Sequence, residues 1–143
     1  MKRIIGLLFL LAISTGNFSC NANSSSASDG SPSISAGKFI TVYYFHFTRR
    51  CMTCNNVEKV SKEAVESQFT AQVKSGEISF KSINLDEKEG EALGAKCKIE
   101  GQALIIISGD KRVDLTDKGF MYANDNPEKL KAEIRKALEG LLK

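Results

Sequence analysis

The sequence FITVYYFHFTRRCMTC, residues 39–54, joins an apolar segment directly to a Cys-x-x-Cys motif. Residues 39–47 are β-branched or aromatic at nearly every position, which predicts a strand buried on both faces, as in the middle of an α/β sheet. Beyond the motif, apolar residues recur at helical spacing as far as Val73. The segment therefore predicts a central strand and an amphipathic helix that begins at Cys51, runs to about Val73 and stops at Gly76.

The pattern downstream predicts three more strands and two more helices, in the overall order β-α-β-α-β-β-α. The two strand–helix–strand passages predict parallel neighbours with right-handed crossovers, and the last two strands predict an antiparallel edge. The fold class is thus α/β, with a four-stranded mixed sheet and helices on both faces. We expect strands at 78–85, 103–108 and 112–115, a hairpin turn at 109–111, a weaker helix at 86–98 interrupted by Gly90 and Gly94, and a last helix opened by Pro127.

The start of the chain predicts export. Lys2 and Arg3 precede an unbroken apolar run of ten residues, 4–13, which together are typical of a secretory signal peptide. The run is shorter than the roughly 20 residues that span a bilayer. Cys20 follows in a segment that resembles a bacterial lipoprotein cleavage box. We therefore expect residues 1–19 to be a signal peptide and Cys20 to be lipidated; cleavage nearby, with Cys20 left as a free thiol, is the alternative.

Composition separates a tether from a folded domain. Residues 20–37 include seven serines and few apolar side chains, which predicts a flexible linker behind the lipid anchor. Residues 38–143 form the expected domain. The whole chain has a net charge of +3, and removal of residues 1–19 leaves 18 basic against 17 acidic residues. Because no basic patch with interleaved aromatic residues is present, the sequence excludes a typical nucleic-acid-binding protein.

Two cysteines three positions apart at the start of a helix suit disulfide exchange. Side chains at i and i+3 are neighbours on a helix, and the partial positive charge of a helix N-terminus favours a thiolate. Cys51 is the expected nucleophile, and Cys54, deeper in the first turn, is the expected resolving thiol. Arg49 and Arg50 would favour the thiolate further if they point toward it, and are otherwise solvated loop residues. Met52 is expected to shape an apolar rim around Cys51.

The chain resembles the thioredoxin superfamily over about residues 38–140. Residues 43–54 are similar to the segment that runs from the central strand to the family's Cys-x-x-Cys motif, residues 83–86 to the end of its next strand, and residues 99–107 to the segment that enters its third strand. The chain also resembles small exported proteins labelled as a nitrophenyl-compound nitroreductase subunit. It has no flavin- or nicotinamide-binding glycine motif, so we expect no cofactor.

The departures from that family lie around the expected site. Ala103 stands where the family has a cis-proline, and we expect a trans Gln102–Ala103 peptide because a cis bond before a non-proline residue costs about 3–4 kcal/mol. In the family that proline shapes the substrate groove and helps to keep metals off the thiols. Arg50 stands where the family has Trp, and Phe45 where it has a buried acid. Arg50, Met52, Gln102 and Ala103 are the expected rim of the site.

Cys97 and His46 are open to two interpretations each. Cys97 is either a small buried hydrophobe or a third thiol close to Cys51, where it could act as a metal ligand. His46, the only histidine, is by default a core or edge residue, with a catalytic or ligand role as the alternative.

The sequence leads to one main functional prediction and two alternatives. The main prediction is an exported thiol–disulfide oxidoreductase, a periplasm-facing monomeric lipoprotein of a Gram-negative-type envelope that contacts the membrane only through its anchor. Its partners would be exported protein disulfides or a membrane thiol donor. One alternative is a soft-metal carrier for copper or zinc that uses Cys51 and Cys54, with or without Cys97 as a third ligand. The other is a redox-inert interaction subunit.

Overall fold

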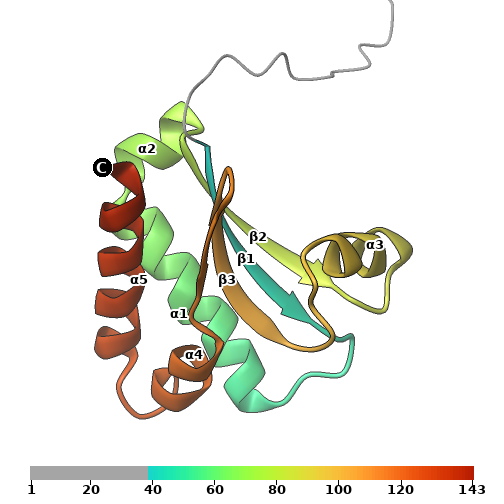
Figure 1. Cartoon of the computed structure of the whole chain (residues 1–143). Coiled ribbons are helices and arrows are strands. Elements are labelled where there is room, and N and C mark those ends of the chain that lie inside the picture. Colours follow the sequence, from blue (N-terminus) through green and yellow to red (C-terminus); the bar gives the residue numbers. More distant parts are fainter. Residues whose placement is uncertain (1–38) are drawn as a thin grey trace, which may run out of the picture. The chain divides into compact units, whose positions relative to one another are not determined.

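Four strands form one mixed sheet in the computed structural model of this protein, which describes residues 39–143 (Figure 1). The strand order is β2-β1-β3-β4; β1 pairs in parallel with β2 and antiparallel with β3, and β4 is antiparallel to β3. The expected signal peptide, Cys20 and the tether lie outside the described residues. The elements are β1 (Ile40–His46), α1 (Met52–Gln68), α2 (Thr70–Ser75), β2 (Ile78–Asn84), α3 (Lys88–Lys96), β3 (Ala103–Ser108), β4 (Lys111–Asp114), α4 (Thr116–Tyr122) and α5 (Pro127–Leu142).

The central strand β1 is buried on both faces because successive side chains point to opposite sides of the sheet. Ile40, Val42 and Tyr44 belong to the larger hydrophobic cluster, which they share with α1, α4 and α5. Phe45 belongs to a smaller cluster, in which Leu93 of α3 packs. Figure 1 shows α3 on one side of the sheet and α1, α4 and α5 on the other. The prediction of an α/β fold with helices on both faces is confirmed.

The direction of β3 corrects the sequence-based prediction. A second strand–helix–strand passage was expected to place β3 parallel to its neighbour. Instead β3 lies on the far side of β1 from β2 and runs antiparallel to β1, with Ala103 opposite Phe45. The reason is that α3, with nine residues, packs against the end of β2 and does not return the chain to the start of the sheet. As a consequence β3 begins at the same end of the sheet where β1 ends.

Gly90 and Gly94 do not interrupt α3, contrary to the prediction from helix propensity. Both glycines are buried and face the end of β2. A Cβ atom at Gly90 would overlap the carbonyl group of Asn84, and one at Gly94 would lie 2.7 Å from Cδ2 of Leu85. The missing side chains therefore allow the helix backbone to approach the strand closely.

The helix after the motif is broken at Phe69, whereas one helix to about Val73 was predicted. Phe69 has non-helical dihedral angles (φ −126°, ψ 36°) and separates α1 from α2. The hydroxyl of Thr70 donates a hydrogen bond to the carbonyl oxygen of Glu66 at 2.8 Å, a pattern that bends helices. Gly76, with φ 79°, ends α2 in the left-handed conformation, as a helix-terminating glycine does.

The helix α4 was not predicted, and it lies beside the start of β3. Its buried Gly119 rests against Val57 of α1 and Leu104 of β3. The backbone N–H of Leu104 donates to the hydroxyl of Thr116 at 3.1 Å, which fixes the start of the helix. Pro127 opens α5, as predicted. None of the helices between residues 39 and 143 combines the length and the apolar character needed to cross a membrane.

Candidate functional site

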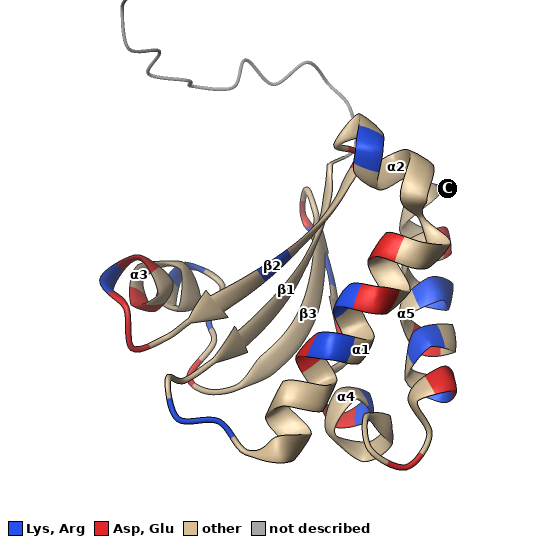
Figure 2. Ribbon diagram, turned by 180° about the vertical axis from the view of Figure 1, so that it is seen from behind, with Lys and Arg blue, Asp and Glu red and all other residues tan. Residues whose placement is uncertain are grey.

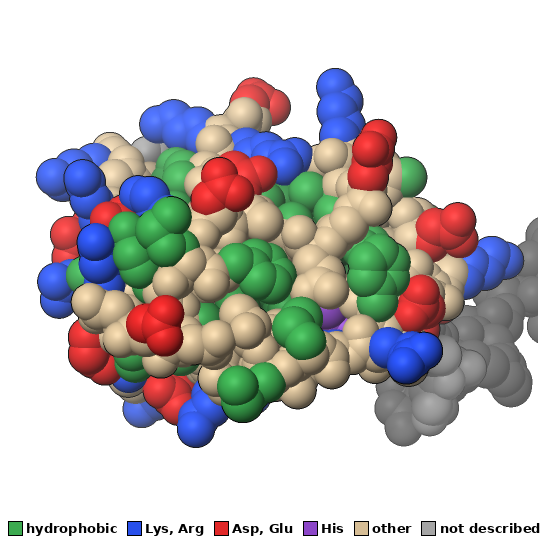
Figure 3. Space-filling model, turned by 90° about the horizontal axis from the view of Figure 1, so that it is seen from below, with side chains coloured by type: hydrophobic (Ala, Val, Ile, Leu, Met, Phe, Trp, Pro, Cys, Tyr) green, Lys and Arg blue, Asp and Glu red, His purple; other side chains and the backbone are tan. Residues whose placement is uncertain are grey.

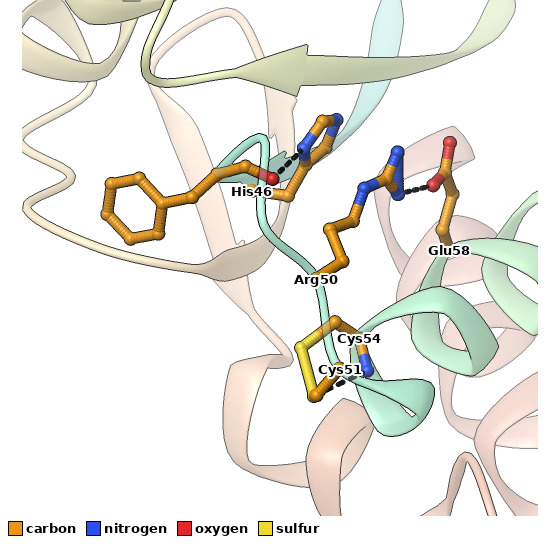
Figure 4. Close-up of polar contacts among 6 residues, drawn as sticks. His46, Arg50, Cys51, Cys54 and Glu58 are labelled. Atoms are coloured by element: carbon orange, nitrogen blue, oxygen red, sulfur yellow. Dashed lines mark hydrogen bonds and ion pairs between the residues drawn. A yellow bond between two sulfur atoms is a disulfide. The ribbon is translucent and has the colours of Figure 1, made fainter.

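Cys51 and Cys54 form a disulfide at the N-terminus of α1, with their Cα atoms 5.2 Å apart (Figure 4). Cys51 is the N-cap residue, with an extended backbone, and its Sγ accepts a hydrogen bond from the backbone N–H of Cys54 at 3.2 Å. Cys51 is exposed, whereas Cys54 is 2 % exposed. The bond thus joins one accessible sulfur to one protected sulfur, as the sequence led us to expect.

The start of α1 offers a favourable environment for a negative charge on Cys51. The first backbone N–H groups of a helix have no partner within it and carry partial positive charge. The first turn of α1 contains no acidic residue that would offset this charge. The N–H of Cys54 already points at the sulfur of Cys51. Reduction of the disulfide would therefore leave a thiolate with a backbone donor in place.

Arg50 forms an ion pair with Glu58, one turn beyond Cys54 on α1. Figure 4 shows its guanidinium group directed toward Glu58 rather than toward the disulfide. Arg49 is exposed in the same loop, which Figure 2 shows as a basic segment before α1. Burial raises the pKa of Tyr44 to about 12, although the charge of Arg50 opposes the rise. The Tyr44 hydroxyl has no hydrogen-bond partner among residues 39–143.

The loop that carries the chain from β1 to Cys51 is anchored on the end of β2. The backbone N–H of Thr48 donates to the carboxylate of Asp86 at 2.7 Å, and the side-chain amide of Asn84 donates to the Thr48 hydroxyl at 3.0 Å. The N–H of Leu85 donates to the carbonyl oxygen of His46 at 2.7 Å. The hydrogen bond from Thr48 holds the pKa of Asp86 below its ordinary value of 3.8. The approach to the motif is therefore fixed by polar contacts from the neighbouring strand.

We expect Asp86→Asn to lower the free energy of unfolding at pH 6 but to have a smaller effect at pH 3. A carboxylate whose pKa is lowered by folding stabilises the protein fully above its ordinary pKa, and this stabilisation is lost as the pH falls through the lowered value. Urea unfolding at both pH values measures the difference, with Asp125→Asn, an exposed position, as the control. An equal loss at both pH values would show that the charge of Asp86 plays no part.

Gln102 and Ala103 lie beside the end of β1, at the end of the sheet where α1 begins. Ala103 is buried and pairs with Phe45. Gln102 is half-buried, and its Oε1 is enclosed without a hydrogen-bond partner among the described residues. The trans peptide between them stays a prediction. The two residues, far from the motif in sequence, thus border its end of the sheet.

Cys97 and His46 do not join the disulfide in a metal site. Cys97 is the C-cap residue of α3 and packs, half-buried, in the smaller hydrophobic cluster. His46 is 7 % exposed, and its Nδ1 lies 3.0 Å from the carbonyl oxygen of Phe47. Within residues 39–143, His, Cys, Asp and Glu side chains form no group of three or more that could hold a metal ion. The three-cysteine ligand set considered from the sequence is not assembled.

Asn124 is a residue of the site that sequence analysis missed. It lies in the loop after α4, and its side-chain amide donates to the hydroxyl of Thr53, between the two cysteines, at 2.8 Å. Its side-chain oxygen accepts a hydrogen bond from the side-chain amide of Asn56 at 2.9 Å. No sequence signal connects Asn124 with Thr53, because the two are 71 positions apart and α4 itself was not predicted.

Several hydrophobic side chains reach the surface at this end of the sheet. Seen from this end, they form separate patches with polar side chains or backbone between them, and most charged side chains lie toward the edges of the face (Figure 3). Met52 of α1 is 74 % exposed and Met121 of α4 is 60 % exposed. The apolar side chain of Met52, next to Cys51, is therefore accessible to a partner molecule.

Comparison with known proteins assigns the chain to no family. No protein-family model matches the sequence, and no curated protein is significantly similar to it. The site itself defines an α/β protein with an accessible disulfide at a helix N-terminus, and the function is argued from that arrangement.

Proposed function

We propose that this protein is an exported thiol–disulfide oxidoreductase with a thioredoxin-like fold, which exchanges disulfides through Cys51 and Cys54. The observation that carries the proposal is the bond between an exposed N-cap sulfur and a protected sulfur one turn into α1. Exposed disulfides are generally the labile, regulatory or catalytic ones, whereas structural disulfides resist reduction. The strand order β2-β1-β3-β4, with the motif directly after the central strand, supports the assignment of fold.

The reaction needs only the two cysteines and a partner. In the reduced protein, the Cys51 thiolate attacks one sulfur of a partner disulfide, and the other partner sulfur leaves as a thiolate. Cys54 then loses its proton and attacks the Cys51 sulfur, which breaks the mixed disulfide and releases the second partner thiol. The partner gains two electrons and the Cys51–Cys54 bond forms. Run in reverse, the same steps oxidise a partner dithiol.

The exposure of Cys51 favours this function over a redox-inert subunit, and the position of Cys97 favours it over a carrier with three thiolate ligands. A redox-inert subunit has no need of an accessible sulfur at a helix N-terminus, where thiolates are favoured. A soft-metal carrier with three thiolate ligands would need Cys97 beside the pair, and Cys97 packs in the hydrophobic cluster under α3 instead.

The proposed site of action follows from the first 37 residues of the sequence. Lys2, Arg3 and the apolar run support export, and Cys20 in its cleavage-box context supports a lipoprotein anchor. The Ser-rich segment that follows would let the domain reach partners in a periplasm-like compartment. These partners are exported protein disulfides or a membrane thiol donor, and the protein acts as a monomer.

The proposal is tested by a redox titration of the full chain carrying Cys20→Ser and Cys97→Ser, so that only the motif can titrate. The protein is equilibrated in glutathione buffers with a chelator, alkylated and weighed by mass spectrometry. We expect one two-electron transition between about −270 and −120 mV, the range of known dithiol exchangers. A pair that stays fully oxidised or fully reduced across that range would rule out the function.

A further inference from the structure

The loop after α4 is hydrogen-bonded to the start of α1. Asn124 makes two hydrogen bonds there, one to Thr53 at 2.8 Å and one to Asn56 at 2.9 Å. Thr53 and Asn56 are three positions apart and therefore neighbours on the helix surface. A single side chain thus connects Thr53, one of the two residues between the cysteines, to the next turn.

The position of Asn124 is itself fixed by packing. Ala123, next to it, is buried in the larger cluster, and its N–H donates to the carbonyl oxygen of Gly119 at 3.0 Å. Gly119 in turn rests on Val57 of α1. Because α4 is seated on α1 in this way, Asn124 can hold the first turn in place.

We propose that Asn124 is a positioning residue that sets the reduction potential of the Cys51–Cys54 pair; this inference rests on the proposed function. In the oxidised protein the disulfide itself closes the first turn of α1. In the reduced protein the N–H of Cys54 stays directed at the Cys51 sulfur only while that turn stays formed, and the ends of helices fray readily. The reduced form therefore depends on Asn124 more than the oxidised form does.

The sign of the effect follows from this difference. Loss of the Asn124 side chain raises the free energy of the reduced protein more than that of the oxidised protein. The dithiol then becomes easier to oxidise, and the reduction potential becomes more negative. The fraction of Cys51 present as thiolate at neutral pH also falls, because its backbone donor is held less firmly.

The test compares Asn124→Ala with Asn55→Ala in the full chain carrying Cys20→Ser and Cys97→Ser. Asn55 lies on the same turn of α1 as Thr53 and Asn56, but its side chain is exposed to solvent. Asn55→Ala is therefore the control, because it makes the same chemical change nearby. For Asn124→Ala we expect the equilibrium with glutathione to move about threefold toward the disulfide, or about 14 mV at roughly 30 mV per tenfold change. Alkylation of Cys51 at pH 6 should slow by a similar factor, and Asn55→Ala should change neither.

A double-mutant cycle with Thr53→Val locates the effect. If Asn124 acts through Thr53, Asn124→Ala shifts the potential much less in the Thr53→Val background than in the parent. A structural role alone would lower the free energy of unfolding of both redox forms equally and leave the potential unchanged, which would overturn the inference while the proposed function stands. Absence of any couple in the parent protein would instead overturn the proposed function itself.

Discussion

Cys51→Ser abolishes disulfide exchange, whereas Cys54→Ser blocks it after the mixed disulfide has formed. Without Cys51 the motif has no accessible nucleophile, because Cys54 is 2 % exposed. We expect the rate of exchange with a disulfide substrate to fall by more than about three orders of magnitude, since loss of the nucleophile removes the covalent pathway itself. With Cys54 replaced, Cys51 still attacks the substrate, but no second thiol is present to release the mixed disulfide.

The two variants are distinguished by their products. After reaction with glutathione disulfide, mass spectrometry should find one glutathione on Cys51 in Cys54→Ser and none on Cys54 in Cys51→Ser. Cys97→Ser is the matched control and should exchange at the parent rate, because Cys97 packs on the other side of the sheet from α1. Glutathione accumulating on Cys54 in the Cys51→Ser protein would reverse the assigned roles of the two sulfurs.

The central strand and the motif could be predicted because their pattern is local. An apolar run followed by a Cys-x-x-Cys motif and helically spaced apolar residues requires no knowledge of distant residues. The observed β1 and the N-cap position of Cys51 follow that pattern closely. The relative exposure of Cys51 and Cys54 could also be predicted, since it depends only on their places at a helix start.

The direction of β3 and the polar contacts of the site could not be predicted in this way. Gly90 and Gly94 have low helix propensity, which predicts an interrupted helix, while in the structure tertiary packing decides their role. Asn124 reaches the motif from the end of α4, a helix whose Gly119 packs against Val57 of α1. Such contacts join segments far apart in sequence, and a single sequence carries no signal for them.

Gly90→Ala strongly destabilises the domain, whereas Gly140→Ala stabilises it. A Cβ atom at Gly90 would overlap the backbone carbonyl of Asn84, so α3 or the end of β2 must move. We expect the free energy of unfolding to fall by at least about 2 kcal/mol, the cost of forced displacement in a packed interior. Gly140 lies in α5, where a Cβ meets no atom within 4 Å. There alanine should raise the free energy of unfolding by about 0.5–1 kcal/mol, because glycine loses more backbone entropy in a helix.

Urea unfolding followed by circular dichroism measures both variants against the parent, so that each serves as the control for the other. The Gly90→Ala variant tests two contacts, that of α3 with the end of β2 and that of Asn84 with Thr48. If α3 rests on the end of β2 through Gly90, the displaced Asn84 also loosens its hydrogen bond to Thr48 in the loop that leads to Cys51. Gly90→Ala should then slow alkylation of Cys51 in the reduced protein, because its sulfur is held less firmly at the helix N-terminus that favours the thiolate. Parent-like stability of Gly90→Ala would mean that α3 does not sit against the end of β2, and the explanation given for the antiparallel direction of β3 would be wrong.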